Sequence, residues 1–145
     1  MTLIIFTDGA SLGNPGPMGI GVAAFRHGKK VKEISEYIGE GTNNIAEYTA
    51  VMRALEFARG EGEKEVHIKS DSQLVVRQLN GEYKVKDEKL KALKLAVDEL
   101  CVGMAVKFEH IPREQNEGAD ALSKEAAEQG KKIVHKGKTG QQKLV

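Results

Sequence analysis

Short apolar segments predict three strands in the N-terminal part of the chain. Residues 3–7 form an apolar run, rich in β-branched side chains, that ends at Asp8, which is typical of a buried strand. Residues 19–25 and 31–38 alternate weakly between apolar and other side chains, and the turn around Gly28 between them is typical of a hairpin. Because short links join the three segments, we expect them to pair as antiparallel neighbours.

Helical spacing of apolar side chains predicts four helices further along the chain, with two more strands between them. The first helix is expected to be capped by Asn43 or Asn44 and to end at Gly60, with Val51 and Leu55 on its apolar face. The other elements expected are helices over residues 72–79, 87–104 and 115–129 and strands over residues 65–70 and 105–111.

This order of elements predicts an α/β fold built on one mixed five-stranded sheet. The last two strands are each reached through a helix, so we expect them to run parallel to the first strand, with helices flanking the sheet. Residues 1–129 are expected to form a single domain. Residues 130–145 contain five lysines and no acidic residue, so we expect them to form a basic C-terminal tail.

Composition and charge narrow the classes of function. The chain has 145 residues, of which 40% are hydrophobic and 30% charged, the balance of an ordinary globular domain. Its single cysteine excludes an internal disulfide and a cysteine zinc cluster. The first apolar run is too short to cross a membrane, so we expect a cytoplasmic protein without a membrane partner. We also expect the protein to be a monomer. Since the net charge is only +1, a nucleic-acid partner would have to be held by local clusters of basic residues.

Four acidic side chains stand where an exposed acid is not expected. Asp8 and Asp71 each end a predicted strand, and in open α/β sheets ligands bind beyond the carboxyl ends of the strands. Glu47 leads the apolar face of the first helix, and Asp120 lies near the start of the last one. Taken singly, Glu47, Asp71 and Asp120 also suit helix capping or a helix N-terminus. Taken together, converging carboxylates repel one another, and Mg²⁺, which prefers oxygen ligands, would neutralise them.

Five short stretches, in this order, carry a resemblance to a known family. They are residues 7–11 (TDGAS), 13–16 (GNPG), 42–48 (TNNIAEY), 70–75 (SDSQLV) and 116–122 (NEGADAL). Through them the chain resembles the type 1 ribonuclease H family from about residue 3 to residue 127. The resemblance implies a ribonuclease H-like fold. It also implies metal-dependent endonucleolytic cleavage of the RNA strand of RNA/DNA hybrids, largely independent of sequence, that leaves 5′-phosphate and 3′-hydroxyl ends.

The resemblance also assigns residues to the site. It implies that Asp8, Glu47, Asp71 and Asp120 are the catalytic ligands of two Mg²⁺ ions, for which Mn²⁺ is a substitute. Further residues are implied to bind the hybrid, through amides in its minor groove and a pocket for a phosphate of the DNA strand. These substrate-binding residues are Gly9, Asn14, Thr42, Asn43, Asn44 and Gln73. Turn formation is the structural alternative for the asparagines.

Two features of many family members are missing from the sequence: a loop with a catalytic histidine before the last acid, and a basic protrusion between the two middle helices. Arg113 follows the last predicted strand, and we expect it to act as a catalytic group in place of the histidine by stabilising phosphate charge or assisting product release. His110 is expected to pack beside the sheet. Two alternatives stay open: a nuclease of the same fold that acts on double-stranded RNA or DNA junctions, and a non-catalytic hybrid-binding module.

Overall fold

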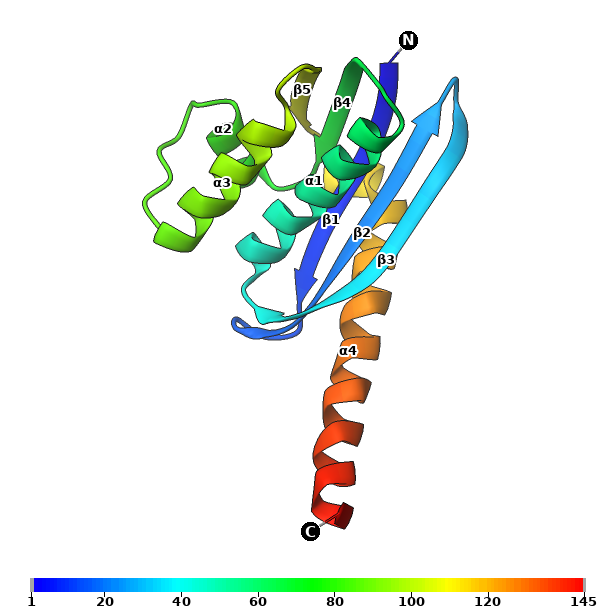
Figure 1. Cartoon of the computed structure of the whole chain (residues 1–145), viewed down its shortest axis with the longest axis vertical. Helices are drawn as coiled ribbons and strands as arrows, with labels where there is room; N and C mark the ends of the chain where they lie inside the picture. The colour runs from blue at the N-terminus through cyan, green and yellow to red at the C-terminus, as the bar shows by residue number, and fades with distance from the viewer. Residues whose placement is uncertain (1, 145) are drawn as a thin grey trace.

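Five strands form one mixed sheet in the spatial order β3-β2-β1-β4-β5 (Figure 1). The structure, a computed structural model, describes the backbone of residues 2–144 and the side chains of residues 2–133. The strands are β1 (Thr2–Ser11), β2 (Gly16–Arg26), β3 (Lys29–Gly41), β4 (Glu65–Ser70) and β5 (Ala105–His110). β2 lies antiparallel between β1 and β3, whereas β4 and β5 run parallel to β1. The predicted α/β class and the predicted strand directions are confirmed.

Helices cover both faces of this sheet. They are α1 (Asn43–Gly60), α2 (Gln73–Leu79), α3 (Glu88–Leu100) and α4 (Glu117–Leu144). α1 packs on β1 and β2 and is itself contacted by α3, while α4 packs on β1, β2 and β3 from the opposite face and is seen behind the sheet in Figure 1. Within the part of the chain that the structure describes, no helix combines the length and the apolar character needed to cross a membrane.

The main core lies between the sheet and α1. Side chains two residues apart in β1 and β4 are buried there, as the alternation of a strand requires. The apolar side chains of this core include Leu3, Ile5, Val22, Val66 and Ile68 from the strands, Tyr48, Val51 and Leu55 from α1, Val75 and Leu79 from α2, and Leu90 and Val97 from α3. The hydroxyl of Tyr48 donates a hydrogen bond to Oε1 of Gln78 at 2.7 Å, so the core also ties α1 to α2.

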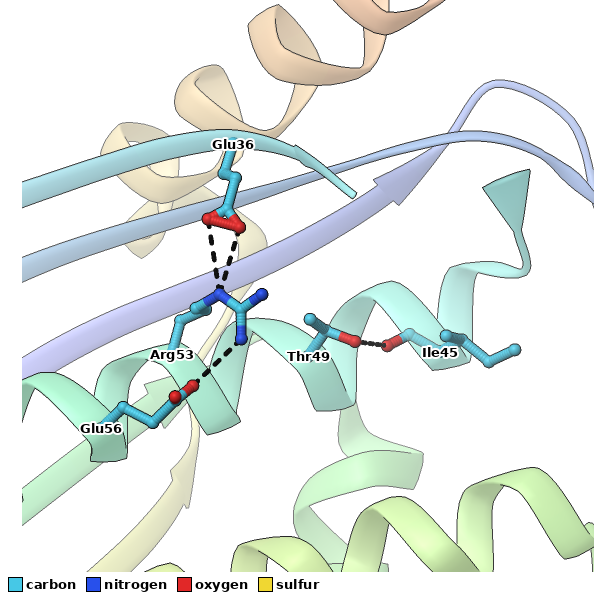
Figure 2. A network of polar contacts seen from close by, with 5 residues as sticks. All are labelled: Glu36, Ile45, Thr49, Arg53 and Glu56. Atoms are coloured by element: carbon cyan, nitrogen blue, oxygen red, sulfur yellow. Dashed lines mark hydrogen bonds and ion pairs between the residues drawn. The ribbon is translucent and has the colours of Figure 1, made fainter. Parts of the chain in front are cut away.

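A polar network connects α1 to the edge strand β3 (Figure 2). Nε of Arg53 donates to Oε1 of Glu36 on β3 at 3.1 Å, and Nη1 of Arg53 donates to Oε1 of Glu56 at 3.0 Å. One turn earlier in α1, the hydroxyl of Thr49 donates to the carbonyl oxygen of Ile45 at 2.7 Å. Since partly exposed ion pairs contribute only about 0–1 kcal/mol each, this network orients β3 over α1 more than it stabilises the fold.

β1 is longer than the apolar run that predicts it. Its antiparallel ladder with β2 continues through Asp8, which pairs with Gly21, as far as Ser11. Asp8 therefore lies within a strand, and the prediction that it ends the strand is wrong. α3 is shorter than predicted, because it ends at Leu100 and Gly103 adopts a positive φ of 85° in the turn that follows.

α4 continues past its predicted end at residue 129 to Leu144 and extends beyond the sheet in Figure 1. Gly130 lies within this helix and provides space for Tyr37 of β3, since a Cβ atom at residue 130 would overlap the Tyr37 ring. The glycine is a packing residue, and the predicted helix end is wrong. The division into a domain of residues 1–129 and a basic tail of residues 130–145 stays a prediction, and the side chains from residue 134 onward lie outside the described residues.

The first turns of α4 lie directly on the backbone of β2, because β2 presents glycines where the helix crosses it. A Cβ atom on Gly21 would overlap the carbonyl oxygen of Ala119, and one on Gly19 would overlap the carbonyl oxygen of Ser123. Asp8 is the β1 neighbour of Gly21. The close approach therefore brings the start of α4 beside Asp8.

Replacing Gly21 with Ala is expected to destabilise the fold by about 1–3 kcal/mol, because the added methyl group has to push α4 away from β2. Gly118→Ala is a matched control on the same helix, since a Cβ atom there meets open space, and helix propensity predicts a gain of about 0–1 kcal/mol. Urea unfolding of the wild type and both variants measures the two differences in the free energy of unfolding. Equal stability of Gly21→Ala and wild type would contradict this account of the interface between β2 and α4.

Candidate active site

Three of the four predicted acids meet at one place. Asp8 lies in β1, Glu47 in the first half of α1, and Asp71 directly after β4. β1 and β4 are parallel neighbours with Thr7 opposite Ser70, so the next residue of each brings its carboxylate to the same edge. One carboxylate oxygen from each acid lies within 4.8 Å of the other two. Asp8 and Glu47 are almost fully buried, with 5% and 7% of their surface exposed, and Asp71 is half-buried.

Glu47 is held in this cluster by two donors from the sheet. The backbone N–H of Gly9 donates to Oε1 at 2.8 Å, and the hydroxyl of Ser70 donates to Oε2 at 3.3 Å. The side chain thus reaches across to β1 and β4, and the interpretation of Glu47 as a cap of its own helix is wrong. Gly9 lets α1 come this close, because a Cβ atom there would overlap the backbone of Ala46 and Glu47.

Asp120 stands apart from the cluster of three acids. Its carboxylate forms an ion pair with Nζ of Lys124 one turn later in α4, at 3.0 Å. It still lies near enough for its negative charge to raise the pKa of Asp8. The structure therefore places Asp120, the fourth predicted acid, beside the cluster of three acids, where it is paired with the ammonium group of Lys124.

Burial and crowding change the protonation of the two innermost acids. Burial raises the pKa of Asp8 to about 6, the charges of Asp71 and Asp120 add to the rise, and a hydrogen bond from Ser123 opposes it. Burial also raises the pKa of Glu47 well above its ordinary value, as does the charge of Asp8, against the effect of the Gly9 N–H. The pair therefore favours a bound proton or cation over two free charges. Clustered carboxylate oxygens of this kind fit a hard divalent cation such as Mg²⁺.

Two polar side chains that sequence reasoning did not select also belong to this site. Nδ2 of Asn116, which is 1% exposed, donates to the carbonyl oxygen of Thr7 at 2.9 Å and to Oδ2 of Asp71 at 3.1 Å. The hydroxyl of Ser123, which is fully buried, donates to Oδ2 of Asp8 at 2.5 Å. Residues 116, 120 and 123 share one side of a helical turn, and this spacing is the signal that could have identified them.

Four of the residues predicted to bind substrate line a single cleft of about 740 Å³. The lining residues are Asn14, Thr42, Asn43, Asn44 and Ile45 with residues 87–90 at the start of α3. Gly9 instead lies in the cluster of acids, and Gln73 is the exposed first residue of α2 and is not among the residues that line the cleft.

Hydrogen bonds within the protein use part of these polar groups. Oγ1 of Thr42 accepts from the Ile45 N–H at 3.4 Å, so Thr42 caps α1 and the predicted cap at Asn43 or Asn44 is wrong. Oδ1 of Asn14 accepts from the N–H of Asn43 at 3.2 Å. Oδ1 of Asn43 in turn accepts from a backbone N–H in β1, at Ser11, at 2.8 Å. These two bonds join residues that are 29 and 32 positions apart, so the amide oxygens of Asn14 and Asn43 connect the end of β1 and the loop after it to the start of α1. Turn formation by the asparagines stays a prediction.

Residues 112–115, which follow the buried Ile111 after β5, are exposed to solvent. Arg113 begins the single 3₁₀ turn Arg113–Gln115 and is exposed. His110, the last residue of β5, is exposed as well, so the prediction that it packs beside the sheet is wrong.

Comparisons with known proteins point to one family. A family model described as reverse transcriptase-like matches residues 6–126. The ribonuclease HI of Halobacterium salinarum is 42% identical over 123 residues, which are 83% of this chain and 62% of that protein. The ribonuclease H of Syntrophus aciditrophicus is 36% identical over 141 residues, covering 86% of this chain and 80% of that protein. The chain spans 35% of the length of its mycobacterial relatives, so it matches only part of several of these proteins.

Solved structures agree with the sequence comparisons. The crystal structure of RNase H1 from Halobacterium salinarum matches with a TM-score of 0.86 at 39% identity, over 89% of this chain and 99% of that one. LC11-RNase H1, isolated from compost, is 44% identical, and its complex with an RNA/DNA hybrid matches with a TM-score of 0.83 over 88% of this chain and 97% of that one. Fold, family model and relatives therefore agree that this chain belongs to the type 1 ribonuclease H family.

Proposed function

We propose that the chain is an endonuclease that hydrolyses the RNA strand of RNA/DNA hybrids with the help of divalent metal ions, Mg²⁺ or Mn²⁺. The observation that carries this proposal is the convergence of Asp8, Glu47 and Asp71 within 4.8 Å at one edge of a ribonuclease H fold. The complex of LC11-RNase H1 with an RNA/DNA hybrid supports the substrate class.

The residues present fit a metal site. Asp8, Glu47 and Asp71 would hold the ions. Burial and neighbouring negative charges raise the pKa values of Asp8 and Glu47, so a bound cation would stabilise their charged forms. When bound, a pair of such ions activates a water molecule and stabilises the leaving oxygen of a phosphodiester. The chain holds its carboxylates for this task through the Gly9 N–H on Glu47 and the Asn116 amide on Asp71. Departure of the 3′ oxygen would leave 5′-phosphate and 3′-hydroxyl ends.

Asp120 is proposed as a fourth ligand. Its partner Lys124 is 58% exposed, and exposed ion pairs of this kind contribute only about 0–1 kcal/mol. The Asp120 carboxylate can therefore give up its ion pair with Lys124 and bind a divalent ion with only a small loss of free energy. Among the described side chains, the other three acids have no such ion pair to give up.

Hybrid recognition is proposed for the cleft lined by Asn14, Thr42, Asn43 and Asn44, together with Gln73. Because Asn14 and Asn43 use their amide oxygens within the protein, their NH₂ groups are left as donors. Such donors match phosphate oxygens, 2′-hydroxyls and base acceptors in a minor groove, and the 2′-hydroxyl is the group that distinguishes RNA from DNA. Contacts to the backbone and groove edges make cleavage largely independent of sequence.

Arg113 is proposed to stabilise phosphate charge or to assist product release. Its exposure leaves the guanidinium free to reach a bound hybrid. Arg113→Ala is expected to lower kcat about tenfold or more at saturating Mg²⁺, with Arg113→Lys recovering part of the loss. Steady-state cleavage of a labelled hybrid measures the effect. An unchanged kcat for Arg113→Ala would remove Arg113 from the catalytic machinery.

The proposed function is tested by comparing substrates of matched sequence. We expect the wild-type protein to cut the RNA strand of a hybrid with Mg²⁺ or Mn²⁺, and to lose this activity in chelator. Preferential cutting of double-stranded RNA or of a DNA junction would favour a different nuclease of the same fold. Binding of the hybrid without cleavage in either metal would favour a non-catalytic binding module.

A further inference from the structure

We propose that Ser123 is a positioning residue that fixes the orientation of Asp8 for metal binding. This inference rests on the proposed function, because it concerns the same carboxylate cluster. Ser123 is fully buried in α4, and its hydroxyl donates to Oδ2 of Asp8 at 2.5 Å. The donor and the acceptor are 115 residues apart in the chain, so this contact exists only when α4 is seated on the sheet.

The packing of α4 on β2 fixes where the Ser123 hydroxyl points. The helix contacts the backbone of β2 at Gly19 and Gly21, where a side chain would collide with it. Within the helix, the Ser123 hydroxyl also contacts the carbonyl oxygen of Asp120 at 2.8 Å. A hydroxyl has one hydrogen to donate, so these two oxygens define its orientation, and the charged Asp8 carboxylate is the stronger acceptor.

Ser123 differs from the other donor that α4 supplies. Asn116 also bonds the backbone carbonyl of Thr7, so its loss would loosen β1 as well as Asp71. Ser123 contacts nothing outside its own helix by hydrogen bonding except Asp8 in the part of the chain described here. Removing its hydroxyl therefore tests the orientation of one carboxylate with little effect on the backbone.

An unrestrained Asp8 carboxylate would have to be ordered by the metal ion itself, and this weakens binding. Groups that hydrogen-bond to metal ligands typically change metal affinity by about 10–100-fold when they are removed. We therefore expect Ser123→Ala to bind Mn²⁺ about tenfold more weakly than the wild type, with a matching rise in the Mg²⁺ concentration needed for half-maximal cleavage. The KM for the hybrid at saturating metal should stay within about twofold.

Two further variants make the experiment specific. Ser123→Cys fills the space of the hydroxyl with a thiol, which is a weak donor, so it should bind Mn²⁺ as weakly as Ser123→Ala without leaving a cavity. Ser35→Ala is the matched control, because the Ser35 hydroxyl of β3 donates to the carbonyl oxygen of Leu122, the neighbour of Ser123, at 2.8 Å and touches no carboxylate. It should leave Mn²⁺ affinity within about twofold of wild type.

Calorimetric titration of Mn²⁺ into each folded protein, with circular dichroism as the check on folding, gives a readout independent of activity. Weaker binding in both Ser123 variants with Ser35→Ala unchanged supports the proposal. Wild-type affinity in both Ser123 variants would overturn it while leaving the proposed function intact. Absence of Mn²⁺ binding in the wild type itself would overturn the proposed function, and the role of Ser123 with it.

Discussion

Asp71→Asn is expected to lower hybrid cleavage by about a thousandfold and to leave hybrid binding nearly unchanged. The substitution keeps the size of the side chain and an oxygen that can still accept from Asn116, so the local structure should persist. It removes one of three negative charges that lie within 4.8 Å of each other, and with it the metal-dependent stabilisation of the reaction. Loss of about 4 kcal/mol of such stabilisation corresponds to a thousandfold in rate.

The measurement is single-turnover cleavage of a labelled hybrid with Mg²⁺, alongside hybrid affinity in chelator. Asp98→Asn is the control, since Asp98 is an acid of α3 whose partner is Lys94 and which lies outside the carboxylate cluster. It should cut at the wild-type rate. Cleavage by Asp71→Asn within tenfold of wild type would mean that the acids serve the fold rather than the reaction.

Asp8→Asn is expected to stabilise the metal-free protein by about 2 kcal/mol at pH 7.5. The folded-state pKa of Asp8 is raised from 3.8 to about 6, so the folded protein binds this proton more tightly than the unfolded chain does. The contribution of Asp8 to stability is therefore greatest at low pH and falls as the pH rises from about 4 to about 6. This rise in the pKa of Asp8 corresponds to a loss of about 3 kcal/mol of folding free energy at high pH. The amide side chain of the Asp8→Asn variant recovers part of that loss because it carries no charge.

Urea unfolding in chelator at pH 5 and pH 7.5 measures this effect. The difference between Asp8→Asn and wild type should be smaller at pH 5, where Asp8 in the wild type is largely protonated. Saturating Mg²⁺ at pH 7.5 should reduce or reverse the difference, because the ion stabilises only the protein that retains all three acids. A difference that is the same at both pH values would contradict the raised pKa of Asp8.

The fold could largely be predicted from local patterns. The apolar run before Asp8 and the helical spacing of Val51 and Leu55 identify elements whose order leaves one reasonable sheet, and that sheet is present. Some errors concern local signals, as at the Thr42 cap of α1, and another lies where a distant contact overrides a local signal. Gly130 is a helix-ending residue by local rules, but the ring of Tyr37 packs against it from β3, and the helix continues.

For the site as well, local patterns pointed to the clustered acids but not to the contacts that depend on how distant elements pack. Asp8, Glu47 and Asp71 were found because each stands at a marked position of its own element, and the sheet brings them together. The spacing of residues 116, 120 and 123 could have pointed to Asn116 and Ser123, but which carboxylate each one contacts depends on how α4 sits on β2. The ion pair of Asp120 with Lys124, by contrast, joins residues four positions apart in one predicted helix, so local spacing could have indicated it.

The hydrogen bonds from Asn116 to Thr7 and from Ser123 to Asp8 join the beginning of the domain to its last helix. During synthesis on the ribosome, the nascent chain exposes Asp8 long before residue 123 has been translated. The hydrogen bonding of the carboxylate cluster is therefore incomplete until α4 has left the exit tunnel and docked on the sheet. We therefore expect a partly made chain, tethered to its own messenger RNA, to lack the proposed nuclease activity until that moment.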